Sequence, residues 1–346
     1  MGLAGCSFPR PPDVPTDSGL GEDAASPEDA ASADAPLASP PASCVGLAPT
    51  CGATHDDDCC HSLAVPGGTY YRGYDLAGDA NSGTQDFPAT ISSFRLDKYK
   101  VTVGRFRTFV EAGMGTQASP PVAGSGAHAR IAGSGWDASW NTALAANTVA
   151  LVAQFKCDGL FVIWTDTVDK VGDNEDRPMN CLTWYEAMAF CAWDGGYLPS
   201  EAEWTYAAAG GDLQRAYPWS TRAAPLQIDA AHASYRDDIG CVGDGLPSCL
   251  PADITAVGIR PDGDGRWGQS GLAGDLFEWM LDWFAPYASV CTDCATVIAP
   301  APDSVRIIRG GTFGDAALTL RNTTRVKGNT AVATFGAGVR CARPAL

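Results

Sequence analysis

The stretch RPMNCLTWYEAMAFCAWDGGYLPSEAEWTYAAAGG, residues 177–211, decides the fold. Apolar side chains recur at helical spacing in its WYEAMAFCAW part, which predicts a helix over 184–193. Ser200 and Glu203 form a capping box, in which each residue's side chain satisfies the other's backbone N–H. A second helix is therefore expected to begin at the residue after Ser200. It should end at Gly210–Gly211, because glycine readily adopts the backbone conformation that closes a helix.

The segments upstream of this stretch predict two strands, a helix and a long loop. Residues 67–73 and 91–102 alternate between apolar and polar side chains, as strands do, and 103–113 changes to helical spacing. Residues 114–150 are rich in Gly, Ala and Ser and are expected to form a loop. The expected core positions are Phe94, Leu96, Tyr99, Phe106, Phe109 and Val110, and the tryptophans expected to anchor the loop are Trp136 and Trp140.

The overall composition favours an irregular globular domain. The chain has 346 residues, is 45% hydrophobic, and contains 39 Gly and 24 Pro, which favours loops over a helix bundle. A formal net charge of -17 argues against nucleic acid as a partner, because the phosphate backbone selects basic surfaces. No run of about 18 apolar residues is present, so no transmembrane helix is expected.

The cysteine count indicates an oxidising compartment outside the cytoplasm. Thirteen cysteines are present, and an odd number leaves one to be explained separately. Residues 1–6 end in L-A-G-C, which is similar to the end of a bacterial lipoprotein signal, with Cys6 as the lipidated residue. Acylation of Cys6 would tether the chain, so we expect membrane contact only through this anchor, or secretion if Cys6 is not acylated.

The N-terminal region divides into a linker and a small cysteine-rich segment. Residues 7–43 are rich in Ala, Pro, Ser and Asp and cannot bury enough apolar surface to fold, which predicts a disordered linker. The segment 44–62 carries four cysteines, and two disulfides are expected there rather than a zinc site, since adjacent cysteines fit tetrahedral coordination poorly. The cysteines of this segment are Cys44, Cys51, Cys59 and Cys60. By proximity, further pairs are expected between Cys157 and Cys181, Cys241 and Cys249, and Cys291 and Cys294.

Residues 63–344 resemble the formylglycine-generating enzyme, or sulfatase-modifying factor, family. The resemblance rests on ordered motifs: GGTYYRGYD, FRLDKYKVT, the 177–211 stretch, GLAGDLFEWMLDWF, RIIRGGTF and GVRCARP. It implies an α+β, loop-rich, C-type-lectin-like fold with few short helices, small β-sheets and disulfide bonds. It also implies a disulfide between Cys191 and Cys341.

The resemblance further implies a structural calcium ion in the turn before Glu278. The matching ligand positions are Gly271, Gly274, Leu276 and Glu278, an oxygen set of the kind that calcium prefers. The alternative is that Glu278 only caps this turn.

The family's copper site is missing from its expected positions. The two cysteines that hold Cu(I) in the family correspond here to Asp315 and Leu320, which offer a hard carboxylate and no donor. We therefore expect no copper and no catalytic residues at these positions. The cleft arginines Arg321, Arg325 and Arg340 either bind an anionic ligand or peptide, or form ion pairs within the fold.

These observations predict a monomeric binding module rather than an oxidase. Its expected ligand is a peptide, a glycan or an envelope protein, bound in the cleft that the family uses for substrate. The enzyme alternative is an oxidase with a displaced thiol pair at Cys291 and Cys294. A third possibility is a purely structural surface protein.

Overall fold

The computed structural model describes residues 40–168 and 174–346, which form an irregular α+β fold of short elements. The α-helices of this part of the chain are α1 (Val103–Glu111), α2 (Thr148–Gln154), α3 (Trp184–Trp193) and α4 (Glu201–Ala208). Its strands are β1 (Ser62–Val65), β2 (Gly68–Tyr71), β3 (Pro88–Ile91), β4 (Phe94–Asp97), β5 (Phe277–Trp283), β6 (Cys291–Thr292), β7 (Arg306–Arg309), β8 (Val326–Gly328), β9 (Ala337–Gly338) and β10 (Ala342–Pro344). The predicted fold class is confirmed.

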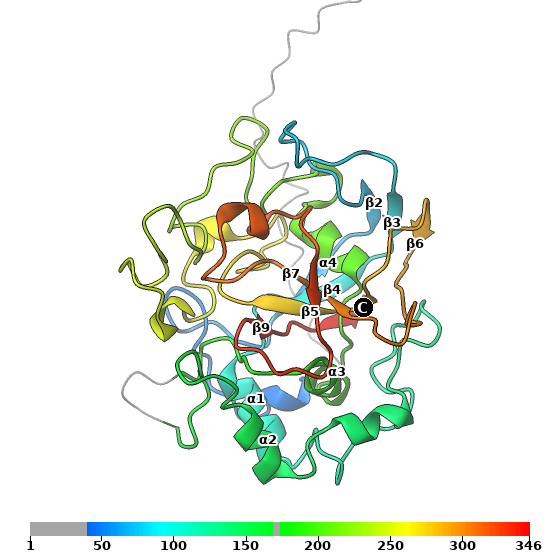
Figure 1. The fold of residues 1–346 in the computed structure, drawn as a ribbon, viewed down its shortest axis with the longest axis vertical. Helices are drawn as coiled ribbons and strands as arrows, with labels where there is room; N and C mark the ends of the chain where they lie inside the picture. The colour runs from blue at the N-terminus through cyan, green and yellow to red at the C-terminus, as the bar shows by residue number, and fades with distance from the viewer. Residues whose placement is uncertain (1–39, 169–173) are drawn as a thin grey trace, which may run out of the picture. The chain divides into compact units, whose positions relative to one another are not determined.

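The strands form three small sheets, with the orders β1-β4-β10, β2-β3-β6 and β8-β7-β5-β9. In the last sheet β5 pairs antiparallel with β7, so Glu278 faces Arg309 across the pair. Figure 1 shows β5 and β7 in the middle of the fold, and both α3 and α4 contact β5. The central sheet therefore places the segments after β7 next to the turn before β5.

The helices form where the sequence predicts them, with one exception. Both α3 and α4 begin with capping boxes, and Ser200 accepts a hydrogen bond from the Glu203 backbone N–H at 3.1 Å. Phe106 of α1 stacks on Phe190 of α3 with ring centroids 5.1 Å apart, which joins the two helices in the core. The predicted loop over 114–150 is wrong at its end, because α2 begins at Thr148 with Asn147 as its N-cap.

Six disulfides link the described cysteines, among them the pair that the family resemblance implies and the three pairs expected by proximity. The long-range bond joins Cys191 of α3 to Cys341, which are 150 residues apart. The other pairs are Cys44–Cys60, Cys51–Cys59, Cys157–Cys181, Cys241–Cys249 and Cys291–Cys294. The two N-terminal disulfides staple the predicted cysteine-rich segment.

The cysteine-rich segment is packed against the domain. Cys51 is fully buried beside Tyr99, and the Gly52 backbone N–H donates to the Val257 carbonyl at 3.0 Å. Ala42–Cys44 forms a short 3-10 turn in which Ser43 is buried. The linker predicted over 7–43 therefore ends too late, because Ser43 already belongs to the folded part.

A buried ionic cluster holds the two ends of the folded region together. Arg105 lies between Asp97 and Asp194, with nitrogen–oxygen distances of 2.9 and 2.6 Å. Arg343 of β10 also contacts Asp194 at 2.6 Å, and the Ser43 backbone N–H donates to the same carboxylate at 2.8 Å. Each charge in this cluster is thus neutralised inside the fold.

The predicted signal remnant 1–6 with Cys6, and the linker up to residue 39, lie outside the described residues. Among the residues that the structure describes, no helix has the length and apolar character needed to cross a membrane.

Candidate functional site

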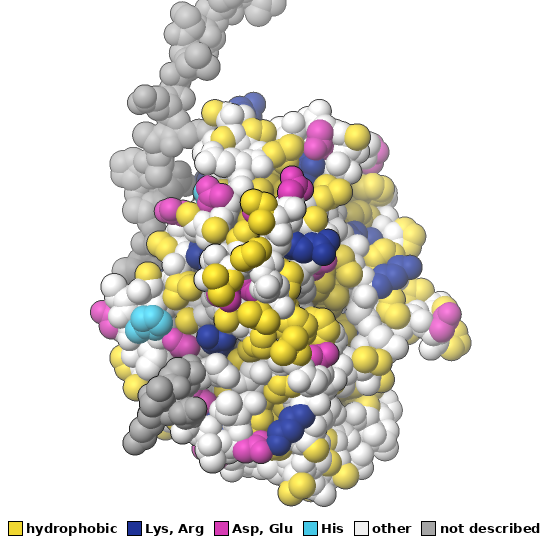
Figure 2. Space-filling view, turned by 60° about the vertical axis from the view of Figure 1, so that its left-hand side comes forward, with side chains coloured by type: hydrophobic (Ala, Val, Ile, Leu, Met, Phe, Trp, Pro, Cys, Tyr) yellow, Lys and Arg dark blue, Asp and Glu magenta, His cyan; other side chains and the backbone are white. Residues whose placement is uncertain are grey.

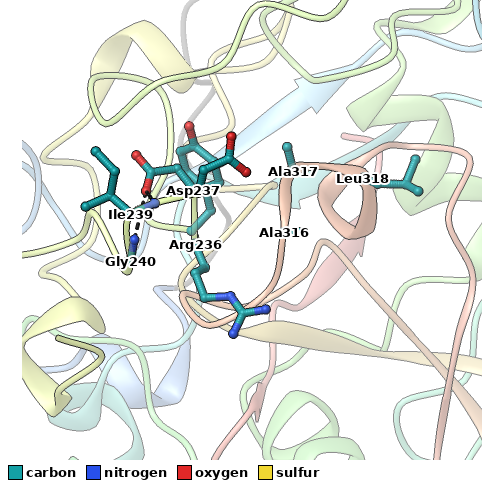
Figure 3. A pocket seen from close by; sticks show the side chains of 9 residues that line it. Arg236, Asp237, Ile239, Gly240, Ala316, Ala317 and Leu318 are labelled. Carbon is teal, nitrogen blue, oxygen red and sulfur yellow. Dashed lines mark hydrogen bonds between the residues drawn. The ribbon is translucent and has the colours of Figure 1, made fainter. Parts of the chain in front are cut away.

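An open pocket of about 660 Å³ lies between two loops of the fold. One wall is the segment 235–240, and the other is Ala316–Leu318 at the start of the short helix η7 (Ala317–Leu320). Figure 3 shows the Asp237 and Arg236 side chains pointing in different directions from the first wall. The first wall is a loop segment and the second includes the first turn of η7, and both present exposed side chains that a ligand can contact.

The pocket combines exposed aliphatic side chains with carboxylates. Ile239 is 83% exposed and Leu318 is 50% exposed, although both are large hydrophobic residues. Asp237 closes its own turn by accepting the Gly240 backbone N–H at 2.9 Å, whereas Asp238 is exposed on the same wall. Figure 2 shows hydrophobic side chains gathered across the middle of one face, with acidic and basic side chains scattered around them.

The positions that correspond to the family's copper cysteines lie just behind this pocket. The Asp315 carboxylate accepts hydrogen bonds from the Thr312 backbone N–H at 2.9 Å and the Thr312 hydroxyl at 2.7 Å. Leu320 is fully buried and packs over Gly311, where an added Cβ would lie 2.5 Å from a Leu320 methyl carbon. Asp315 therefore closes the turn, and Leu320 fills the core beneath the pocket.

The turn that precedes β5 connects both walls of the pocket. The Asp275 backbone N–H donates to the Ser234 carbonyl at 3.0 Å, next to the wall that begins at Tyr235. The Phe313 backbone N–H donates to the Asp275 carbonyl at 3.0 Å, on the side of Thr312. The shape of the pocket thus depends on the conformation of this turn.

The three predicted cleft arginines form ion pairs within the fold. Arg321 contacts Asp75 at 2.6 Å and Asp79 at 2.7 Å, and Arg340 contacts Glu278 at 3.0 Å. Arg325 pairs with Glu201 at 2.7 Å. All three arginines are thus ion-paired within the fold, and none of them lines the pocket. Of the two alternatives that the sequence left open for these arginines, the contacts favour internal ion pairing.

Crowding around Glu201 gives a prediction for the pH dependence of stability. Burial and the neighbouring Glu201 carboxylate raise the pKa of Asp282 to about 7. The folded protein thus holds this proton at pH values where the unfolded chain has released it, so the Asp282 contribution to stability falls as pH rises from about 4 to about 7. We expect Asp282→Asn to make this decline shallower, measured as the unfolding free energy at several pH values. An unchanged slope would contradict the shifted pKa.

The oxygens predicted to bind calcium surround a lysine side chain. Lys100 donates a hydrogen bond to the Gly271 carbonyl and another to the Gly274 carbonyl at 3.1 Å, and its Nζ lies 3.4 Å from Glu278 Oε1. No such contact is made by Leu276, which is buried in the core. A calcium ion does not fit among these oxygens while the ammonium group is present. The position of the Lys100 side chain therefore does not fit a calcium ion at the predicted ligands.

The displaced thiol pair considered for an oxidase is a disulfide in the structure. Cys291 and Cys294 are bonded to each other, and Cys291 is buried in β6. Figure 1 shows β6 at the right-hand edge of the fold, away from the segment around residue 240 on the left. These cysteines do not contribute to the pocket beside Thr312.

The pocket residues Tyr235–Gly240 were missed by sequence reasoning. Their only sequence signal is a large hydrophobic residue, Ile239, placed after two aspartates and before a glycine in a stretch without periodicity. Such a pattern is typical of any acidic turn. It does not indicate a pocket, because the other wall, Ala316–Leu318, is remote in the sequence.

The fold, with a glycine-rich turn after its central strand, defines a domain of the formylglycine-generating type. Residues 48–345 match the family described as the sulfatase-modifying factor enzyme 1-like domain. The chain belongs to this family, as its motifs predict.

The similar proteins include formylglycine-generating enzymes and a hercynine oxygenase. The formylglycine-generating enzyme of Streptomyces coelicolor is 27% identical over 261 residues, covering 72% of this chain and 78% of that protein. The corresponding enzyme of Thermomonospora curvata is 26% identical and covers 72% and 82%. Hercynine oxygenase of Mycolicibacterium smegmatis is 27% identical over 76% of this chain, which spans 56% of that enzyme.

Solved structures of the same fold are more distant in sequence. PvdO from Pseudomonas aeruginosa superimposes with a TM-score of 0.54 at 18% identity, covering 82% of this chain and 94% of PvdO. The Treponema denticola variable protein 1 gives a TM-score of 0.51 at 17% identity, covering 82% and 95%. At these identities the likeness concerns the fold alone.

Proposed function

We propose that this chain is a non-oxidase binding protein that holds an extended polypeptide in the pocket between residues 235–240 and Ala316–Leu318. The observation that supports the proposal is an open pocket in front of the two positions that correspond to the family's copper cysteines, which here hold side chains that cannot bind Cu(I). Asp315 is engaged by Thr312, and Leu320 is buried. The site can therefore retain a ligand surface without the thiolates that Cu(I) requires.

The pocket's chemistry favours a peptide that carries an aliphatic and a basic side chain. Its volume of about 660 Å³ falls in the usual range for ligand pockets. Ile239 and Leu318 offer exposed apolar surface, and the Asp238 carboxylate on the same side favours a Lys or Arg of the ligand. An extended segment can present such side chains in alternation to the two walls.

A glycan is less well matched to the nearby aromatic residues. Sugars are commonly held against the open face of an aromatic ring. Trp219, which packs in one cluster with Tyr235 of the pocket wall, is stacked with Tyr217 and with His232, with centroids 5.3 and 5.1 Å apart. Trp136 is buried in the core. These rings already make ring contacts or are buried within the protein, which favours the peptide over the glycan.

The six disulfides support an oxidising, extracytoplasmic compartment for this function. We further propose that Cys6, which lies outside the described residues, is acylated and attaches the chain to an envelope membrane. The partner would then be an envelope protein or a secreted protein with an accessible extended segment.

The proposal is tested with a random peptide library displayed on phage and selected on the full chain. Two exposed isoleucines provide a matched pair of variants, because Ile239 is 83% exposed in the pocket and Ile298 is 81% exposed outside it. We expect Ile239→Asp to raise the Kd of the selected peptides at least tenfold, which is a loss of about 1.4 kcal/mol of binding free energy. Ile298→Asp should bind them as the wild type does.

Two results would overturn the proposal. One is equal binding of the selected peptides to the Ile239→Asp and wild-type chains. The other is formylglycine in a C-x-P-x-R peptide after incubation with the copper-supplied full chain, detected by mass spectrometry, which would establish the oxidase alternative. The Cys291→Ala and Cys294→Ala double variant would then show whether the displaced pair supplies the thiols.

A further inference from the structure

The turn before β5 is built around the side chain of Lys100. The Lys100 ammonium donates to the carbonyls of Gly271 and Gly274 and lies 3.4 Å from Glu278 Oε1. Its side chain is 3% exposed. A single cation therefore gathers two backbone oxygens and one carboxylate in the interior of the protein.

The backbone around Lys100 fixes the ammonium group in this place. The Ser270 backbone N–H donates to the Lys98 carbonyl at 2.8 Å, and the Val101 backbone N–H donates to the Val339 carbonyl at 2.8 Å. Gly274 has a φ of +83°, and a Cβ at this position would lie 2.2 Å from the Ser234 carbonyl oxygen. The turn thus adopts a conformation that requires glycine at this position, with the Gly271 and Gly274 carbonyls directed at Lys100.

Two cations already face the single carboxylate of this cluster, so no negative charge is left over for a metal ion. Burial alone would raise the pKa of Glu278, but Arg340 and Lys100 hold it below its ordinary value. Arg340 donates to both Glu278 oxygens at 3.0 Å, and the Trp204 indole N–H donates to Oε2 at 2.7 Å. A divalent cation at this place would lie next to the Lys100 ammonium and the Arg340 guanidinium group. The Glu278 carboxylate alone would then have to offset three positively charged groups.

We propose that Lys100 supplies, from within the chain, the positive charge that the family resemblance assigns to calcium. An ammonium group can satisfy carbonyl and carboxylate oxygens through its three N–H donors, whereas calcium needs six to eight oxygens at 2.3–2.6 Å. The turn and the β5 strand that follows it are therefore built without calcium. The folding of this chain does not depend on the ion.

Thermal unfolding of the full chain in a chelator and in millimolar calcium tests this proposal. The wild-type midpoint is expected to be the same in both. Lys100→Ala leaves the Gly271 and Gly274 carbonyls and the Glu278 carboxylate around an empty space. The unfolding midpoint of this variant should therefore be lower than that of the wild type in chelator. Calcium at about 100 times its Kd should raise the midpoint of the variant by about 4 °C. Magnesium at the same concentration controls for general effects of ions.

A second variant separates charge from volume. Lys100→Met fills the space without a charge or donors, so it should be less stable than the wild type and should not respond to calcium. The proposal is overturned if calcium raises the wild-type midpoint, or if Lys100→Ala folds and is unresponsive. If neither variant folds, calorimetric titration of the wild-type chain with calcium decides: stoichiometric binding overturns the proposal, and the lack of it supports it.

Discussion

Replacement of Cys191 and Cys341 by alanine is expected to lower the free energy of unfolding by about 5 kcal/mol, the largest effect among the six described disulfides. The disulfide joins residues 150 apart, so it removes many conformations from the unfolded chain. Both sulfurs are buried in the main core, between α3 and the strand segment that leads to β10. Chemical denaturation of the oxidised double variant measures the loss.

The disulfide between Cys291 and Cys294 is the matched control, because its loop spans only 3 residues. The same entropic relation gives a loss of about 1.6 kcal/mol when this pair is replaced by alanine. Equal losses from the two double variants would show that loop closure does not explain the stabilisation.

Arg105→Met is expected to lower the free energy of unfolding by about 3–5 kcal/mol. The methionine fills a similar volume but leaves the carboxylates of Asp97 and Asp194 short of a cation in an environment without water. Arg343 contacts both carboxylates and can neutralise only one of them. Removal of one partner from a buried cluster leaves a charge that neither solvent nor protein stabilises. Chemical denaturation of the variant measures the loss.

Lys156→Met is the control for this variant. The Lys156–Asp166 pair has a distance of 2.7 Å, but both side chains are more than half exposed, so water solvates them when the pair is broken. The control should change stability by less than about 0.5 kcal/mol. A loss for Arg105→Met as small as that of the control would show that the cluster does not carry the expected energy.

The parts of the fold that depend on local chemistry were predictable from the sequence. The capping boxes at Thr183 and Ser200 set the starts of α3 and α4 through interactions between residues three positions apart. The predicted core positions, such as Phe94 and Phe106, are buried because their spacing follows the period of a strand or a helix. The close cysteine pairs formed for the same reason, since short separations leave few alternatives.

Most parts that depend on distant contacts were not predictable from the residues, and the distant Cys191–Cys341 pair was expected only through the family resemblance. Lys100 lies in a segment that reads as an ordinary strand, and its burial is decided by Glu278 far along the chain. The sequence left two alternatives open for Arg321 and Arg325, because their ion-pair partners Asp75 and Glu201 belong to other segments. The pocket needs two loops that are remote in sequence, Tyr235–Gly240 and Ala316–Leu318, and neither has a distinctive pattern.

Ser43 and Arg343 both bind the Asp194 carboxylate, which brings the first and last described segments of the domain close together. The first and last described segments line one hollow, with Pro40 and Leu346 both in its wall. A host protein could accept this domain within one of its surface loops, because the two junctions would enter and leave at neighbouring points. Circular permutants that join these segments through a short glycine-rich bridge should be tolerated for the same geometric reason.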